Sequence, residues 1–432
     1  MSSTYAIVTL GCKTNQFESA AMGEQLQRGG YRQVDFSSGA DLVVVNTCTV
    51  TAATDSQSRN LIRRAKRLNP AARIIVTGCY AQIDPQSLKQ IPGVTLVIGN
   101  HEKATLLDHI QGQKTAGEIK VADIREQHIL EPLTLAGFEQ RSRAFVQIQN
   151  GCDAFCSYCI IPYARGKSRS VPVPAVVDQV KKLSAAGYPE IVLTGIHIGQ
   201  YGLDFDPGTN LLMLLQRIET SGFNGRLRLG SIEPKELSND LLRYIIDSEW
   251  ICPHFHIPLQ AGDDETLKRM NRHYSTDFFA QLLDQIRENL PDAAIGTDII
   301  SGFPGESDRQ FEKTHRFLED LPLTHLHVFP FSRRRGTPAE TLPGQLAGDV
   351  IRERATLLRQ VGIRKNSAFA QRFVGSRLEL VMEGGGAADK SHKGLSQNYL
   401  PVWVDAAHVH QGKRLDVMIT EHTQNGLVGN PA

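Results

Sequence analysis

Three closely spaced cysteines, Cys152, Cys156 and Cys159, lie in the segment NGCDAFCSYCIIPYARG. Thiolates are soft ligands, and three of them at this spacing can face one iron–sulfur cluster or one zinc ion. A structural zinc site normally has four protein ligands, and no further Cys or His lies within twenty residues of the three. The spacing therefore favours a [4Fe–4S] cluster with one iron left open to a substrate or cofactor. A zinc knuckle completed by a distant ligand, or three incidental buried thiols, are the alternatives.

Three other cysteines each end a short apolar run: Cys12 ends YAIVTLGC, Cys48 ends DLVVVNTC and Cys79 ends ARIIVTGC. Their separations correspond to about one βαβ unit each. If the three runs are neighbouring parallel strands, their carboxyl ends lie side by side, where open α/β sheets bind ligands. The pattern predicts a second three-sulfur site. The alternative is that each cysteine is a small residue filling a core.

The remaining cysteine and the histidines of the central region carry a weaker signal. Cys252 has no Cys partner nearby, and we interpret it as a buried small hydrophobic residue. His197, His254, His256 and His273 are candidates for a general base, but barrel histidines are more often packed residues. We assign none of them a catalytic role.

The elements around the cysteines divide the chain into units. In the first part, β-branched runs alternate with helical patterns, which is typical of βαβ units and a parallel sheet. The expected strands are 4–12, 41–48, 73–79 and 95–99, and the expected helices are 16–29 and 55–68.

From residue 143 the alternation restarts and continues for six units, which predicts a barrel or partial barrel with its functional residues at the carboxyl ends of the strands. The expected strands are 144–149, 190–195, 226–231, 254–259, 293–300 and 325–331, separated by helices at 173–186, 209–221, 235–247, 262–290 (in two pieces) and 307–320. A basic amphipathic helix is expected at 347–370. Short alternating segments within 373–428 predict a small antiparallel β barrel.

The predicted fold is therefore α/β, with an N-terminal parallel-sheet βαβ domain, a central partial (βα)6 barrel and a C-terminal small antiparallel β barrel. We place the domains at 1–115, 138–368 and 369–432, with a polar linker at 116–137.

Composition sets further bounds. The 432 residues include 47 basic and 46 acidic side chains, so the chain has no overall charge signature for nucleic acid, and any such site must be a local patch. No signal peptide or membrane-spanning run is evident. An odd number of cysteines, seven, in a chain of this type favours metal binding or catalysis over disulfides, and we expect a cytoplasmic protein.

Several motifs resemble a known family. A CxxxCxxC motif after the first strand of a βα barrel is similar to that of the radical S-adenosylmethionine (SAM) superfamily. GCKTNQFES, NTCTVT and TGCYAQ resemble the N-terminal domain of its methylthiotransferases, which insert a methylthio group at an unactivated C–H bond. The likeness covers residues 4–367 and includes ARGKSRS, LTGIHIGQYG, GSIEP, HIPLQAGDDETLKRMNRHY, TDIISGFPGE and HVFPFSRRRGTPA.

The first motif separates the branches of that family. Its GCK-x-N form is similar to the MtaB-type tRNA N6-threonylcarbamoyladenosine methylthiotransferases, whereas the isopentenyladenosine branch typically shows GCQMN and the ribosomal-protein branch GCPKN.

The resemblance implies two 4Fe-4S clusters, and SAM as both methyl donor and radical source. Cys152, Cys156 and Cys159 would hold the SAM-cleaving cluster. An auxiliary cluster carrying the sulfur to be transferred would be held by Cys12, Cys48 and Cys79. All six count as catalytic residues on this interpretation.

For SAM contacts we expect Thr194 and Gly195 after the second barrel strand and Ser231 and Glu233 after the third. Two arginines that could pair with the SAM carboxylate complete the set, Arg165 and Arg169. Each has a plain structural alternative, such as a helix cap for Glu233 or a tight turn for Gly195.

For RNA, we expect contacts from basic clusters at 59–67, at 333–335 and on the helix at 347–370, the last with Arg352, Arg354, Arg359, Arg364 and Lys365. The C-terminal barrel resembles the TRAM domain, an RNA-binding module. Its residues 371–430 carry no net charge, however, so shape or the aromatic residues Tyr399 and Trp403 would have to serve instead.

The resulting hypothesis is a radical SAM transferase that adds a methylthio group to carbon 2 of the adenine in N6-threonylcarbamoyladenosine of tRNA, next to the anticodon. Its partners would be tRNA, an electron donor such as flavodoxin or ferredoxin, and a sulfur source, without a membrane. The alternatives are methylthiolation of another tRNA adenosine or of a ribosomal protein side chain, and a non-catalytic iron–sulfur protein that binds RNA.

Overall fold

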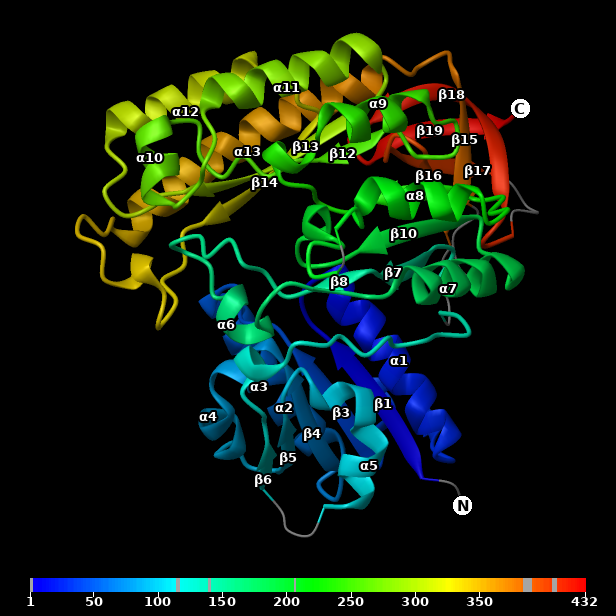
Figure 1. The fold of residues 1–432 in the computed structure, drawn as a ribbon, viewed down its shortest axis with the longest axis vertical. Helices are drawn as coiled ribbons and strands as arrows, with labels where there is room; N and C mark the ends of the chain where they lie inside the picture. Colours follow the sequence, from blue (N-terminus) through cyan, green and yellow to red (C-terminus); the bar gives the residue numbers. More distant parts are fainter. Residues whose placement is uncertain (1–2, 114–116, 139–140, 206, 384–390, 406–409) are drawn as a thin grey trace.

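A computed structural model describes residues 3–113, 117–138, 141–205, 207–383, 391–405 and 410–432. Figure 1 shows an N-terminal domain at one end, a larger central domain with long helices, and a small β barrel packed beside the central domain. In this part of the chain, no helix combines the length and apolar character needed to cross a membrane.

The N-terminal domain is built on a six-stranded parallel sheet with the order β2-β1-β3-β4-β5-β6. Its strands are β1 (Thr4–Thr9), β2 (Arg32–Gln33), β3 (Leu42–Thr47), β4 (Arg73–Gly78), β5 (Val94–Ile98) and β6 (Glu118–Lys120). Every residue of β3 is buried, as expected for a central strand covered on both faces. The helices are α1 (Lys13–Arg28), α2 (Ala52–Leu68), α3 (Cys79–Ile83), α4 (Pro85–Lys89) and α5 (Leu106–Gln111).

The segment expected as a linker, 116–137, differs from that expectation. Its residues 118–120 form β6, which pairs in parallel with β5 and becomes the edge strand of the N-terminal sheet. Further along, Ile124 and Leu135 are buried. The polar composition hid these contacts because a short edge strand needs few apolar residues.

The central domain contains six parallel strands in two groups, ordered β11-β10-β7 and β12-β13-β14. They are β7 (Ala144–Gln147), β10 (Glu190–Thr194), β11 (Arg226–Leu229), β12 (His254–His256), β13 (Ala294–Ser301) and β14 (His325–Pro330). Single parallel bridges, Leu227 to Ile251 and Ser231 to His256, join the two groups. The result is the predicted partial barrel.

Helices flank these strands in the predicted order. They are α7 (Val173–Ala185), α8 (Leu211–Glu219), α9 (Asn239–Asp247), α10 (Asp264–Arg269), α11 (Thr276–Asn289), α12 (Asp308–Asp320) and α13 (Gly348–Gln371). Except for α10, whose Leu267 packs in a separate smaller cluster with Phe303, these helices contribute apolar residues to one core with the strands, which includes Phe255, Ile295 and Phe279. A short helix, α6 (Ile161–Arg165), and the two-stranded pair β8 (Gln149–Asn150) and β9 (Arg169–Ser170) follow β7.

The C-terminal domain is a closed five-stranded barrel with the order β15-β16-β17-β19-β18. Its strands are β15 (Arg377–Met382), β16 (Ser391–Ser396), β17 (Pro401–Asp405), β18 (Arg414–Thr423) and β19 (Gly426–Pro431). Pairing is antiparallel except between β17 and β19, which are parallel. The fold class predicted from the sequence is therefore confirmed.

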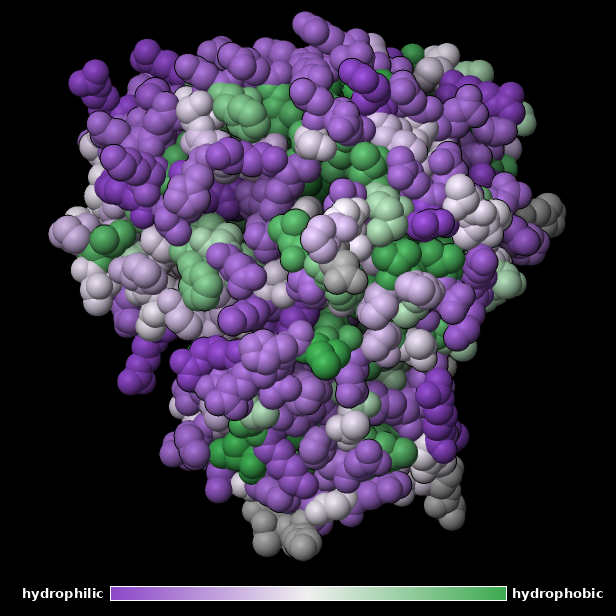
Figure 2. Space-filling model, viewed as in Figure 1, coloured by the Kyte–Doolittle hydropathy of each residue, from purple (hydrophilic) through white to green (hydrophobic). Residues whose placement is uncertain are grey.

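Helix α1 joins the first two domains. Its residues Phe17 and Ala21 belong to the same hydrophobic core as Phe138 and Phe145 of the central domain. The face of the molecule in Figure 2 is mostly hydrophilic, with hydrophobic patches scattered through its middle part.

Candidate functional site

The N-terminal cysteines lie at the carboxyl ends of three adjacent strands. Cys12 follows β1 and is the N-cap of α1, Cys48 follows β3, and Cys79 is the first residue of α3 after β4. The strands are paired in the order β1, β3, β4, so the three sulfurs come from neighbouring strand ends, as the spacing predicts.

Two glycines allow the cysteine loops to approach closely. Gly11 and Gly78 both have φ of +99°, a conformation that favours glycine. A Cβ atom placed on Gly11 would lie 2.9 Å from Cβ and 3.0 Å from Sγ of Cys48. Any larger residue at position 11 would therefore push the Cys12 loop away from Cys48.

The three thiols also interact electrostatically. Burial, the nearby Cys79 and the more distant Cys12 raise the pKa of Cys48 to about 11. The raised pKa means that burial disfavours the thiolate form of Cys48. A metal centre that accepts three thiolates removes that cost, so the donor set fits an iron–sulfur cluster.

Arg165 connects this site to the central domain. It is the last residue of α6, six residues after Cys159, and its fully buried guanidinium donates a hydrogen bond from Nε to Cys79 Sγ at 3.3 Å. The same side chain donates to Asn15 and Asn150, and it forms an ion pair with Glu18.

Glu18 also pairs with Lys103, and both side chains are buried. Burial by itself would raise the pKa of Glu18, but Arg165 and Lys103 hold it at about 2. Arg165, Glu18 and Lys103 thus form a charged network between the two domains, beside the cysteines.

The second cysteine group lies after β7, as predicted. Its loop is held by backbone hydrogen bonds, from Cys152 N to Gly166 O at 3.0 Å and from Cys159 N to Cys156 O at 2.9 Å. Phe155 adopts a φ of 44°, and Asn271 donates to the carbonyl oxygens of Ala154 and Phe155 at 3.3 and 3.1 Å. The loop is therefore fixed by the segment that follows α10.

Two side chains contact these sulfurs. Nδ1 of His197 lies 3.3 Å from Cys152 Sγ, and its Nε2 lies 2.6 Å from Oε1 of Glu236. Arg272 lies 3.6 Å from Cys156 Sγ through Nη1 and pairs with Glu233 through both guanidinium nitrogens. Burial by itself would lower the pKa of His197, but Cys152 and Glu236 raise it to about 10.

The donor set here fits a cluster held by three thiolates. Burial and the neighbouring Cys156 raise the pKa of Cys159 well above its usual range. His197 contacts Cys152, but among the described residues no three of these four side chains have their ligand atoms within 4.8 Å of one another, which disfavours a single zinc ion.

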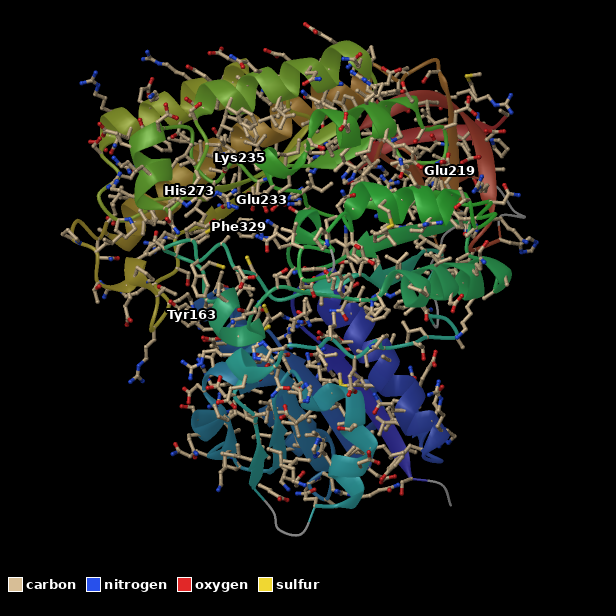
Figure 3. The ribbon with its side chains drawn as sticks, in the orientation of Figure 1. Tyr163, Glu219, Glu233, Lys235, His273 and Phe329 are labelled. Atoms are coloured by element: carbon tan, nitrogen blue, oxygen red, sulfur yellow. The ribbon has the colours of Figure 1, made fainter. Side chains whose placement is uncertain are left out.

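The residues expected to contact SAM lie in different settings. Thr194 ends β10 and is buried, while Ser231 is exposed after β11. A Cβ on Gly195 would meet Ile198 Cγ2 at 2.8 Å and the backbone oxygen of Gln149 at 3.0 Å, so no side chain fits there. Glu233 faces Arg272. Figure 3 shows Glu233, Lys235, His273 and Phe329 on the central domain, with Tyr163 of α6 below them.

The two arginines of that set lie elsewhere. Arg165 is used by the N-terminal site, and Arg169 donates from Nη2 to the backbone oxygen of Arg165 at 2.7 Å and from Nε to that of Lys167 at 3.3 Å. Both guanidinium groups are buried against protein atoms. Their contacts favour a role in holding the Cys79 side of the interface.

A histidine cluster lies on β12 and β14. Nε2 of His256 and Nδ1 of His327 lie 3.0 and 3.2 Å from the same oxygen, Oδ1 of Asp298 on β13. The ligand atoms of the three residues lie within 4.8 Å of one another. His254 and His325 stack at 6.0 Å beside them. These residues alternate with Phe255 and Ile295, which face the helices, so the cluster faces the inside of the barrel.

The basic clusters expected to contact RNA are only partly free. Arg354 is buried and pairs with Glu306 and Asp308, Arg364 pairs with Glu319, and Lys365 donates to backbone oxygens of Glu319 and Leu321. Arg334 is buried and pairs with Asp55 across the domain interface. Besides the paired Arg364, the exposed basic residues of these clusters are Arg63, Arg64, Arg67, Arg333, Arg335, Arg352 and Arg359.

Sequence reasoning missed Arg272, Asn15, Glu18 and Lys103 as parts of the sites. The first three lie inside the motifs HIPLQAGDDETLKRMNRHY and GCKTNQFES. These motifs indicated the family but did not assign a role to the three residues. Lys103 lies outside any motif, and only the fold brings it to Glu18.

Comparisons with known proteins give the family. Residues 4–99 match the model described as "Uncharacterized protein family UPF0004", and residues 146–318 match the radical SAM superfamily. The chain is 38% identical over 423 residues, 96% of this chain and 93% of the relative, to the threonylcarbamoyladenosine tRNA methylthiotransferase MtaB of Bacillus subtilis. It is 39% identical over 402 residues, 92% and 95% of the two chains, to the protein of that name from Aquifex aeolicus.

The chain belongs to the radical SAM methylthiotransferase family. The cofactors of the family are SAM and [4Fe–4S] clusters. The chain is also 32% identical over 446 residues, 99% of this chain and 98% of the relative, to the tRNA-2-methylthio-N(6)-dimethylallyladenosine synthase of Desulfotalea psychrophila.

Among solved structures, the chain resembles a radical SAM methyltransferase, TsrM from Kitasatospora setae. The TM-score is 0.57 at 17% sequence identity, covering 79% of this chain and 77% of that one. At this identity the likeness concerns the fold alone.

Proposed function

We propose that this methylthiotransferase converts N6-threonylcarbamoyladenosine of tRNA, next to the anticodon, to its 2-methylthio derivative. The observation that carries the proposal is the near full-length likeness, at 38 and 39% identity, to two relatives named for this nucleoside. The relative named for dimethylallyladenosine is 32% identical.

Two separate sulfur sites support the chemistry. A SAM-cleaving cluster would supply a 5′-deoxyadenosyl radical, and an auxiliary cluster would supply the sulfur. On this proposal Cys152, Cys156 and Cys159 hold the first cluster, and the second is held by Cys12, Cys48 and Cys79. In the net reaction, the C2–H bond of adenine would be replaced by a C–S bond. The hydrogen would leave in 5′-deoxyadenosine, formed with methionine when one SAM is cleaved by an electron from the donor, and the electron released on C–S bond formation would remain on the auxiliary cluster. A further SAM would give its methyl group to the sulfur and leave as S-adenosylhomocysteine.

The protein's own charges support both sites. Arg165 donates to Cys79 and Arg272 approaches Cys156, so each site has a buried cation beside one thiolate. Such donors stabilise negative charge on sulfur and favour ligation by thiolates. Thr194, Ser231 and Glu233 remain candidate SAM contacts on the central domain.

RNA phosphates would meet exposed arginines on both domains. Arg63, Arg64 and Arg67 of α2 and Arg333 and Arg335 after β14 remain exposed. The ion pair of Arg334 with Asp55 of α2 brings these two clusters into one neighbourhood. The proposal further includes a one-electron donor such as flavodoxin or ferredoxin, a sulfur source, and a cytoplasmic location.

The experiment is nucleoside mass spectrometry of bulk tRNA from cells with and without the gene. Without the gene, we expect the 2-methylthio-N6-threonylcarbamoyladenosine peak to disappear and its precursor, N6-threonylcarbamoyladenosine, to accumulate. The product peak should return with the wild-type gene but not with Cys48→Ala. An unchanged peak would contradict the proposal and point to another adenosine or a protein side chain.

A further inference from the structure

Lys13 begins at one sulfur site and reaches toward the inside of the barrel. It directly follows Cys12 and is the first residue of α1. Its Nζ lies 5.8 Å from the ring centroid of Tyr399, in the turn between β16 and β17 of the C-terminal barrel. His254 of β12 contacts the same ring, with centroids 4.5 Å apart. The ammonium therefore lies where all three domains meet.

The charges around Tyr399 are paired except for this one. The guanidinium carbons of Arg143 and Arg228 lie 5.9 and 4.9 Å from the ring centroid. Arg228 donates to Glu190 at 2.8 Å, and Arg143 donates to Glu383 at 2.8 Å. Within the part of the chain that the structure describes, Lys13 forms neither an ion pair nor a hydrogen bond.

Desolvating an ammonium group without an anionic partner costs free energy, which a bound ligand could compensate. Lys13 is only partly exposed, so its ammonium is not fully solvated and has no anionic partner among the described residues to compensate. Arg143 and Arg228 repel it, and Glu190 is already shared among Arg143, Arg226 and Arg228. A carboxylate brought in by a ligand would satisfy the charge.

We propose that Lys13 binds the carboxylate of the threonylcarbamoyl group and so selects this nucleoside. The inference rests on the proposed function. In adenine, C2 and the carbon that bears N6 flank the same ring nitrogen, so the N6 substituent lies close to the carbon that receives sulfur. Cys12 and Lys13 are consecutive, so the same turn of backbone carries a proposed sulfur-site ligand and the proposed carboxylate-binding group.

The same arrangement disfavours an apolar substituent. A dimethylallyl group at N6 carries no charge, so its binding would leave the ammonium desolvated and without a partner. Lys13 thus provides both attraction to the acid and a penalty against the neutral group. No other described lysine adjoins a cysteine of either site.

The test compares binding of anticodon stem-loop RNAs to the anaerobic enzyme with both clusters. The RNAs carry N6-threonylcarbamoyladenosine, its methyl ester, or N6-dimethylallyladenosine at one position. Because a charge-assisted contact is worth about 1.5 to 3 kcal/mol, wild type should bind the acid roughly 10- to 100-fold more tightly than the ester. Lys13→Gln should remove this difference, and Lys13→Arg should keep most of it.

Two further measurements separate a binding role from a structural one. With Lys13→Gln, the KM for the acid RNA should rise while iron content and reductive SAM cleavage without RNA stay unchanged. Lys181→Gln, at an exposed position on α7, is the matched control and should behave as wild type. If Lys13→Gln loses iron, Lys13→Arg is used instead: tighter binding of the acid than of the ester by this variant supports the charged contact, and equal binding contradicts it.

The outcomes distinguish the two proposals. An unaltered preference for the acid in Lys13→Gln, with wild type making the product, would overturn the role of Lys13 alone. Failure of wild type to methylthiolate the acid RNA would overturn the proposed function itself. Equal binding of acid and ester by an active wild type would likewise exclude a charged contact.

Discussion

Replacing Arg165 by methionine should destabilise the interface between the N-terminal and central domains. The guanidinium is fully buried and contacts Glu18, Asn15, Asn150 and Cys79. Breaking a buried ion pair by removing one partner typically costs about 3 to 5 kcal/mol, because the other charge stays buried. Lys103 still pairs with Glu18 in the variant, so we expect the lower end, about 3 kcal/mol.

The assay is thermal unfolding of the anaerobic protein, followed by circular dichroism. For a domain of the size of the central one, about 1 kcal/mol shifts Tm by about 2 to 4 °C, so Arg165→Met should lower Tm by about 6 to 12 °C. Arg165→Lys keeps the charge but loses the planar guanidinium, so its Tm should lie between those of wild type and Arg165→Met.

Arg169→Met is the matched control. Arg169 is equally buried, but among the described residues its hydrogen bonds are to backbone oxygens of Arg165 and Lys167. Its removal should cost about 1 to 2 kcal/mol. If Arg165→Met were no less stable than Arg169→Met, the charged network would not hold the two domains together, and the reasoning would be refuted.

Three more predictions follow from the two sites. Cys48→Ala should lower iron from about eight to about four per chain and abolish methylthiolation while 5′-deoxyadenosine still forms; loss of both activities would contradict the division between the sites. Arg272→Met leaves Glu233 without its ion-pair partner and should raise the KM for SAM by about 10-fold or more. The control Lys268→Met, at an exposed position, should leave the KM unchanged. If the two variants have the same KM for SAM, Arg272 has only a structural role. The pKa of Glu18 falls from 4.5 to about 2 on folding, so its carboxylate contributes about 3 kcal/mol above pH 4.5. This contribution should be lost as the pH drops from 4.5 to 2. In urea unfolding of the metal-free proteins, the difference in free energy of unfolding between wild type and Glu18→Gln should therefore shrink over that range. A difference that stays constant would rule out the linkage.

Much of the architecture could be predicted because periodicity and the strand-end cysteines are local signals. Alternating apolar runs located the six barrel strands to within a few residues, and β3 was expected from VVV alone. The convergence of Cys12, Cys48 and Cys79 followed from the rule that neighbouring parallel strands end at one edge.

What the sequence could not give is how polar residues pair across domains. Arg165 was expected near SAM because an arginine fork suits a carboxylate, yet the fold places it against Glu18 and Cys79. Arg354 belongs to a basic helix but is buried against Glu306. Such pairings depend on contacts between residues far apart in the chain, which neither composition nor spacing encodes.

Tyr399 illustrates the same limit. As an aromatic residue of the C-terminal barrel it was a candidate for stacking on RNA, but its ring lies between His254, Arg228 and Lys13. The barrel thereby closes one end of the central domain, and this was visible only in the structure.

The most direct test of the account is the reaction itself. Purified protein reconstituted anaerobically with iron and sulfide is given SAM, a one-electron reductant and a tRNA anticodon loop that carries N6-threonylcarbamoyladenosine. Mass spectrometry of the digested RNA should then show the 2-methylthio derivative, together with 5′-deoxyadenosine. SAM cleavage without any methylthiolated nucleoside, with both cysteine groups loaded, would contradict the account.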